Sequence, residues 1–179
     1  MLEESRDAEN LRTLLGLRKR LPFRTIAADV VGHSPDNWFS RITLDKGTAD
    51  GVVVGSAVIT SNGVVGQVVN ASAMASVARL LTDPNQTIGT LIPRINQVGV
   101  LAGRGSSPPV IQYVSVEAPV DVGDRVVSLG NAGVFPAGHP IGVVSAVRRD
   151  VSGTNLTIEV RPSENYYDLA EVLVLPPTR

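Results

Sequence analysis

Glycine and proline divide most of this chain into short pieces. Sixteen of the seventeen glycines, and all but one of the twelve prolines, lie after Arg24, so a long helix is not expected there. The runs between them are rich in valine, a pattern typical of strands separated by turns. We expect twelve strands, over residues 25–32, 39–45, 56–60, 63–72, 76–82, 87–93, 97–104, 110–116, 124–130, 141–150, 156–163 and 171–176.

Twelve short strands are too many for one small barrel, but they suit two barrels of about six strands each. A weak internal repeat supports two units: "GVVVGSAV" resembles "VDVGDRVV" when Gly55 is set against Gly123, and "VVGQVV" resembles "PIGVVS" when Gly66 is set against Gly142. Each unit would begin with a hairpin, at 25–45 and at 87–104. The turn residues Asp-Pro-Asn in "TDPNQ" place the division between the units near residue 84.

Residues 1–21 have the pattern of a helix. Ala8, Leu11 and Leu15 fall at the spacing of a coiled-coil seam, and Leu14 flanks it. Acidic residues come early and basic residues late, as the helix dipole favours, and Pro22 ends the run. The pattern begins without a cap, so we expect further sequence upstream. The helix either packs on its own domain or is the end of a longer coiled coil.

The fold class predicted is therefore mainly β, with an N-terminal α-helix, the end of a coiled coil, followed by two small, roughly six-stranded β-barrels. The expected division is a helix at 1–22, a first barrel at 23–84, a second barrel at 85–176 and a tail at 177–179. The last strand could complete either barrel, so an exchange of strands between the barrels is possible.

Several function classes are disfavoured by composition. The net charge of −1 gives no reason to expect a nucleic-acid partner. The chain has no cysteine and only two histidines, more than a hundred residues apart, so no metal-ligand spacing is present. No phosphate-binding loop or run of about 18 apolar residues occurs. We expect no metal and no cofactor.

An enzyme is the first alternative, because paired barrels also occur in chymotrypsin-like serine proteases. The stretch "GHSPDNWFSRITLDKGTADGV" (32–52) gathers His33, Asp36 and Ser40 near the only tryptophan. A serine nucleophile needs a glycine-rich loop with oxyanion donors, and no such loop is found. Ser-Pro-Asp-Asn indicates a turn instead, and His139 in "AGHPIG" also lies in a turn.

A peptidoglycan-binding module is the second alternative. It needs an aromatic-lined groove, in which Trp38, Tyr113, Phe135, Tyr166 and Tyr167 would have to converge.

The valine-rich runs raise a third possibility, a surface that contacts another domain or a partner. Consecutive valines in "VVVGSAV" and "GVVGQVV" face both sides of a sheet, so that they either pack on the neighbouring barrel or dock a partner.

Longer motifs identify the chain as similar to one family. The pattern "DNW", then "ITLDKGTADGVVVG", then "GVVGQV", resembles the extracytoplasmic part of the rod-shape-determining protein MreC family, as do "LLTDPNQTIGTLI" and "VDVGDRVVSLG". The resemblance spans about residues 20 to 175. The motif residues, which we expect to be structural, are Asp36, Asn37, Trp38, Asp45, Lys46, Gly47, Gly51, Gly55, Gly66, Asp83, Pro84, Gly123 and Gly142.

The resemblance implies a non-catalytic scaffold of the cell-elongation machinery, which maintains rod shape by organising and activating peptidoglycan synthesis. It implies a location on the extracytoplasmic face of the bacterial inner membrane, with a single membrane anchor outside this sequence. Its implied partners are a class B penicillin-binding transpeptidase, MreD, RodA and, across the membrane, MreB. It also implies self-association, as a dimer through the Ala8, Leu11, Leu14 and Leu15 seam or as a filament.

Overall fold

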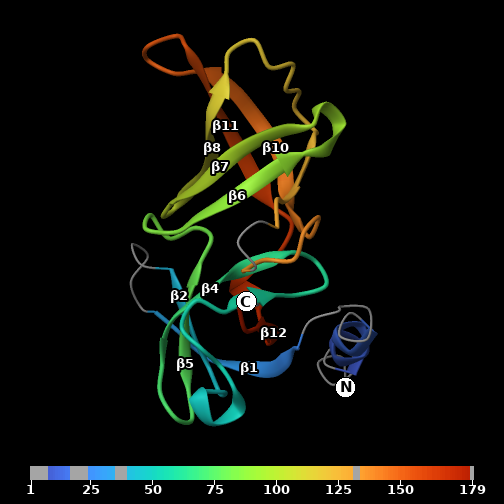
Figure 1. Ribbon diagram of the computed structural model, residues 1–179, viewed down its shortest axis with the longest axis vertical. Helices are drawn as coiled ribbons and strands as arrows, with labels where there is room; N and C mark the ends of the chain where they lie inside the picture. The colour runs from blue at the N-terminus through green and yellow to red at the C-terminus, as the bar shows by residue number, and fades with distance from the viewer. Residues whose placement is uncertain (1–7, 17–23, 35–39, 131–133, 178–179) are drawn as a thin grey trace.

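The computed structural model describes residues 8–16, 24–34, 40–130 and 134–177. Residues 8–16 are helical, and two closed antiparallel barrels of six strands each follow along the long axis of the molecule (Figure 1). The predicted fold class is confirmed, and each of the twelve predicted strand ranges overlaps one observed strand. The remainder of the predicted 1–21 helix lies outside the described residues. Among the residues described, no helix is both long and apolar enough to span a membrane.

The first barrel has the ring order β1-β12-β3-β4-β5-β2. Its strands are β1 (Ile26–His33), β2 (Arg41–Leu44), β3 (Ala57–Ile59), β4 (Val64–Ala71), β5 (Ser76–Leu80) and β12 (Glu171–Leu175). The second barrel has the ring order β10-β11-β8-β7-β6-β9. Its strands are β6 (Thr87–Ile92), β7 (Gln97–Arg104), β8 (Ser107–Ser115), β9 (Arg125–Ser128), β10 (Pro140–Arg149) and β11 (Asn155–Pro162).

The C-terminal strand β12 closes the first barrel. It pairs with β1 through Ile26 and Val174, and with β3 through Ile59 and Leu173. All its residues after Glu171 are buried. The division at residue 84 therefore leaves the first barrel one strand short. The sequence left open which of the two barrels the last strand completes. In the structure it completes the first barrel.

The internal repeat is visible in the backbone. Gly55 and Gly123 have φ angles of 97° and 98°, a left-handed conformation that glycine adopts without strain. The next residue caps each turn, because Ser56 Oγ accepts a hydrogen bond from the Val53 N–H (3.2 Å) and Asp124 Oδ2 accepts one from the Asp121 N–H (2.9 Å). The two copies therefore fold in the same way locally.

Setting the repeats against each other makes β3, β4 and β5 equivalent to β9, β10 and β11. The ring orders then match only if β12 takes the place of β6, β1 that of β7, and β2 that of β8. Each unit begins with a hairpin as expected, β1–β2 in the first and β6–β7 in the second. The two hairpins are not equivalent, because β1–β2 takes the ring position of β7–β8. The equivalent of β6 in the first barrel comes from the end of the chain.

Candidate functional site

The two barrels meet at the turn between β3 and β4. Four side chains of the second barrel and of the segment that returns to β12 contact this turn. His139 Nε2 lies 2.7 Å from the Thr60 carbonyl oxygen, Ser163 Oγ donates to the Asn62 carbonyl (2.8 Å), and Tyr166 Oη donates to the Val64 carbonyl (3.2 Å). Thr60 Oγ1 also donates to the Glu164 carboxylate. These bonds fix the relative position of the barrels.

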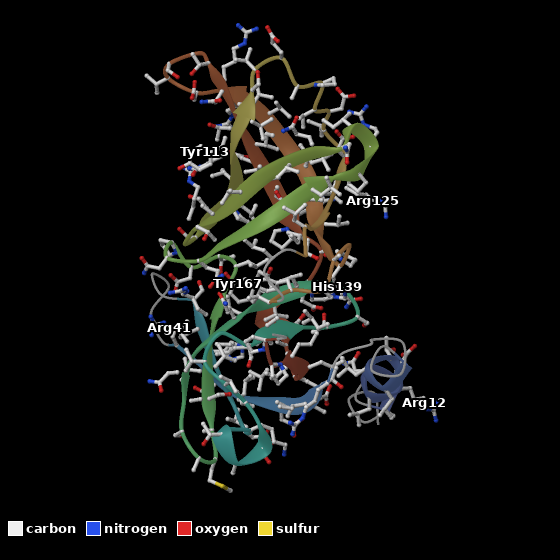
Figure 2. The ribbon with its side chains drawn as sticks, in the orientation of Figure 1. Arg12, Arg41, Tyr113, Arg125, His139 and Tyr167 are labelled. Atoms are coloured by element: carbon white, nitrogen blue, oxygen red, sulfur yellow. The ribbon has the colours of Figure 1, made fainter. Side chains whose placement is uncertain are left out.

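His139 is buried at this junction (Figure 2). Burial lowers its pKa, although the backbone hydrogen bonds to Thr60 and Gly63 oppose that shift. The neutral ring must carry its proton on Nε2, because a carbonyl oxygen can only accept. The ring therefore bonds to backbone rather than to a serine hydroxyl; Ser128 Oγ instead accepts from the His139 backbone N–H (3.0 Å). This is not the arrangement of a catalytic base.

Tyr166 has a structural place in the same junction. Its pKa is raised above the ordinary tyrosine value, first by burial and then by the nearby Glu164 carboxylate, so the phenol keeps its proton and donates to Val64. Val64 and Val65 are both fully buried, whereas Val53 and Val54 are half exposed. Of the two valine runs, "GVVGQVV" thus packs at the barrel junction, and part of "VVVGSAV" faces solvent.

A groove of about 710 Å³ opens between the barrels. We name it the inter-barrel groove. Its wall on the first barrel is formed by the end of β1, the start of β2 and the end of β5. Its wall on the second barrel is formed by the β7–β8 turn and the start of β8 (105–109), Ser145 and the end of β11. Residues 164–167 close it from the side. The residues that the argument below uses are Arg41, Arg161, Glu164 and Tyr167.

A smaller cavity of about 330 Å³ lies between the helix and the first barrel. Leu14 is 6% exposed and packs against the barrel, where Leu173 lines the same cavity. Leu11 and Leu15 also line it but remain 48% and 53% exposed, and Ala8 is exposed. The helix therefore packs on its own domain through Leu14 while its leucine stripe stays half open.

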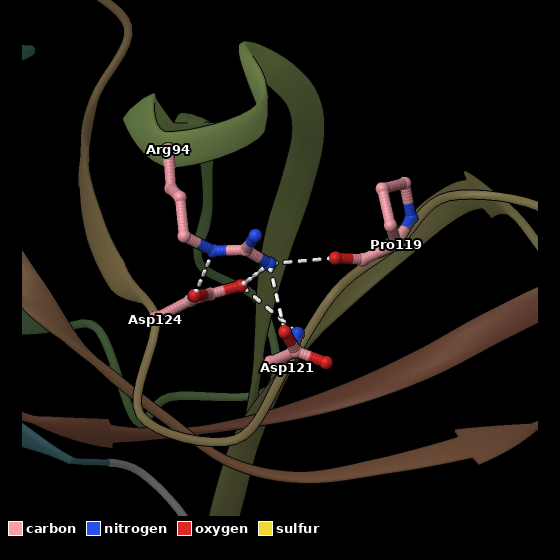
Figure 3. Close-up of polar contacts among 4 residues, drawn as sticks. All are labelled: Arg94, Pro119, Asp121 and Asp124. Atoms are coloured by element: carbon pink, nitrogen blue, oxygen red, sulfur yellow. Dashed lines mark hydrogen bonds and ion pairs between the residues drawn. The ribbon is translucent and has the colours of Figure 1, made fainter.

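Arg94 anchors the loop that precedes β9 (Figure 3). It lies in the short helix η2 (Pro93–Ile95) and donates to both carboxylate oxygens of Asp124, at 2.6 and 2.9 Å, and to the Pro119 carbonyl at 2.6 Å. Asp121 adds an ion pair at 3.3 Å. The hydrogen bond from Arg94 lowers the pKa of Asp124, and burial of the carboxylate opposes that shift.

Replacing Asp124 by asparagine is expected to destabilise the chain by about 1 kcal/mol at neutral pH; the value is small because Arg94 is half exposed and its charge is screened. A lowered pKa in the folded state stabilises the fold above the unfolded-state pKa, and that contribution is lost as the pH falls through the folded-state pKa. Urea denaturation of wild type and Asp124→Asn should therefore differ at pH 7 and converge in strong acid. A difference that is the same at both pH values would contradict this assignment.

The motif residues that the structure describes lie mostly at turns. Asp45 Oδ1 accepts from the Asp29 N–H (2.8 Å) and joins β2 to β1; Lys46 follows it at the rim of the helix cavity. Gly47 is buried against the backbone of residues 72–75, where a Cβ would lie 2.1 Å from the Ser72 carbonyl oxygen, and Gly51 has a φ of 97°. Asp36, Asn37 and Trp38 lie outside the described residues.

The remaining motif residues lie where two strands approach closely and in the segment that links the two barrels. A Cβ on Gly66 would lie 1.9 Å from the Arg79 carbonyl oxygen, and one on Gly142 would lie 2.2 Å from the Arg161 carbonyl oxygen. Asp83 is fully buried and its Oδ1 accepts from the Asn85 N–H (2.8 Å), while Pro84 is exposed beside it. The sequence did not single out Arg41 or Arg161, because the groove joins residues far apart in the chain.

The described aromatic side chains do not converge on one groove. Tyr166 and Tyr167 line the inter-barrel groove, Phe135 lines a separate small pocket near β6, and Tyr113 lies on the outside of the second barrel (Figure 2). Tyr113 has a φ of 65° at a bulge of β8. Within the described ranges, no cluster of three histidine, aspartate or glutamate residues could hold a metal ion.

Comparison with known sequences identifies relatives along most of the chain. The family model for "Rod shape-determining protein MreC, barrel core" matches residues 30–176. The cell shape-determining protein MreC of Caulobacter vibrioides is 37% identical over 134 residues, 75% of this chain and 39% of the relative. That of Escherichia coli is 31% identical over 166 residues, 92% of this chain and 45% of the relative. The chain thus spans less than half the length of either protein.

Solved structures share the fold. One structure of MreC has a TM-score of 0.88 at 28% identity and covers 96% of this chain and 98% of its own. The crystal structure of MreC from Pseudomonas aeruginosa has a TM-score of 0.79 at 30% identity, with 84% and 98% covered. A chain of the complex between penicillin-binding protein PBP2 and MreC from Helicobacter pylori has a TM-score of 0.66 at 15% identity, with 84% and 98% covered, a likeness of fold alone.

Proposed function

Because the chain belongs to the family of the rod shape-determining protein MreC, we propose that it is a non-catalytic scaffold that organises and activates peptidoglycan synthesis during cell elongation. Its curated relatives are cell shape-determining proteins. The described histidine at the barrel junction bonds to backbone rather than to a nucleophile, which favours a role in binding over a role in catalysis.

The partner proposed first is a class B penicillin-binding transpeptidase. The observation that carries this choice is the Helicobacter pylori complex, in which PBP2 is bound to MreC and a chain with this fold is present. Docking of the scaffold would activate the enzyme by binding one of its conformations more tightly than the others. MreD, RodA and, indirectly, MreB are further proposed partners, on the family resemblance alone.

The proposed location is the extracytoplasmic face of the bacterial inner membrane, with the anchor contributed by sequence outside this chain. Self-association is proposed to run through the helix, because Leu11 and Leu15 remain half exposed at seam spacing. Leu14 instead packs on the barrel. In this proposal Leu14 packs on the barrel of its own chain, and Leu11 and Leu15 pack on the helix of a second copy. The helix would then connect the barrels to the dimer interface.

Sedimentation velocity of this chain, alone and mixed with the extracytoplasmic part of a class B transpeptidase, tests both proposals. We expect a concentration-dependent dimer and a larger species in the mixture. Leu11→Asp with Leu15→Asp should abolish the dimer, because two charges would enter the apolar seam, and should leave the mixed complex. The helix surface mutation Arg12→Gln serves as the control for both. Monomers at every concentration would contradict self-association, and an unchanged transpeptidase boundary would contradict the partner.

A further inference from the structure

The inter-barrel groove carries two guanidinium groups without an anionic partner. Arg41 starts β2 on the first barrel and Arg161 lies one residue before the end of β11 on the second, and both line the groove. Within the described parts of the chain, the recorded ion pairs involve only Arg94 and Arg148 among the arginines. Nε of Arg41 is buried without a hydrogen-bond partner. These two cations are available to a ligand.

Among the described residues that line the groove, one is a carboxylate, and it is already engaged. Glu164 accepts from Thr60 Oγ1 and, through Oε1, from the Asn165 N–H at 3.1 Å. The groove therefore has an excess of positive charge and complements a ligand that carries carboxylates.

The apolar part of the groove is presented from a backbone held in place. Tyr167 is 91% exposed, yet its backbone is held because Asn165 Oδ1 accepts from the Tyr167 N–H (3.1 Å) at the start of the short helix η4 (Tyr166–Asp168). Pro108 and Pro109 stiffen the opposite wall. An exposed tyrosine beside arginines is the composition of protein-binding surfaces, in which these two residue types supply much of the affinity.

We propose that the inter-barrel groove binds an extended, acidic peptide segment of a partner protein, with its carboxylates paired to Arg41 and Arg161 and an apolar side chain against Tyr167. The groove volume is within the range of ligand-binding clefts, about 300–1,000 Å³. A glycan is less well matched, because sugar recognition relies on several exposed rings, and of the two tyrosines in the groove Tyr167 is exposed while Tyr166 is buried.

This inference rests on the proposed function only in taking a protein as the partner, and its test uses no transpeptidase. Phage-displayed random linear peptides would be selected on the chain and counter-selected on Arg41→Gln/Arg161→Gln, whose fold is first checked by amide hydrogen exchange. We expect the selected peptides to contain aspartate or glutamate. Changing those carboxylates to amides, or testing the double variant, should weaken binding of the synthetic peptide about tenfold or more.

The control is Arg125→Gln, which matches the loss of one charge in Arg41→Gln or Arg161→Gln alone, at an exposed arginine on the far side of the second barrel from Arg41 (Figure 2). It should bind the peptide like wild type. No selected peptide, or peptides that are indifferent to Arg41 and Arg161, would overturn the proposal. It would also be overturned if soluble peptidoglycan fragments bound through the two arginines while peptides did not. Transpeptidase binding in the sedimentation experiment, together with failed selection, would leave the scaffold role and remove this site.

Discussion

A chain that lacks residues 171–179 is expected to lose the first barrel and keep the second. The deletion removes four register pairs with β1 and three with β3. It also removes Val172, Leu173, Val174 and Leu175, each at most 2% exposed. Burying such a side chain contributes about 1.5–3 kcal/mol, so the loss is roughly 6 kcal/mol or more, comparable with the stability of a whole domain. The second barrel retains all six of its strands.

Amide hydrogen exchange separates the two barrels. Protection should disappear from β1 to β5 and remain in β6 to β11. A deletion of residues 176–179 alone serves as the control, because it leaves β12 intact. The milder change Leu173→Ala should cost about 2–5 kcal/mol and open the same strands first. Uniform protection across both barrels after the longer deletion would show that β12 is dispensable.

Gly66→Ala is expected to destabilise the first barrel by about 3 kcal/mol. Gly66 lies in β4 between Val58 of β3 and Leu80 of β5. An added Cβ would lie 1.9 Å from the carbonyl oxygen of Arg79 and 3.0 Å from the Cα of Leu80. Both are backbone atoms, so no side-chain rotation relieves the contact and the strands must separate. Urea denaturation measures the change.

Gly32→Ala is the matched control for this substitution, on another strand of the same barrel. Its Cβ would meet Thr43 Cβ at 3.6 Å, an ordinary contact. The change should be neutral or slightly stabilising, because alanine restricts the unfolded chain. Equal denaturation midpoints for the two variants would disprove the close-approach argument. Gly142→Ala should behave like Gly66→Ala in the second barrel, where the clash is with Arg161.

The sequence predicted the strands because the information is local. A run such as residues 97–104 alternates buried and exposed positions between turn signals, and the strand found there has the same bounds. Paired glycines such as Gly55 and Gly123 also revealed the repeat, since the same φ recurs in both turns. What local patterns could not give was the partner of β12, because two barrels with equivalent rings accept the same kind of strand.

The candidate site was harder to predict, for a related reason. Arg41 and Arg161 are separated by more than a hundred residues, and neither is among the motif residues identified from the sequence. They share one groove only because the segment around Tyr166 returns the chain to the first barrel. The catalytic hypothesis about "GHSPDNWFS" arose from neighbours in sequence, and Asp36 and Trp38 of that stretch lie outside the described residues.

The place of β12 limits how such a chain can be recombined during evolution. In the second barrel a short turn joins β6 to β7, and in the first barrel the end of β12 lies beside the start of β1, where Val174 pairs with Ile26. Two copies of one six-stranded unit are thus present, but the first copy is split across the whole length of the chain. A crossover near residue 84 between two family members would produce a first barrel assembled from both parents. The second barrel is one continuous segment and can be inherited as a separate module. The first barrel is made of two segments and cannot.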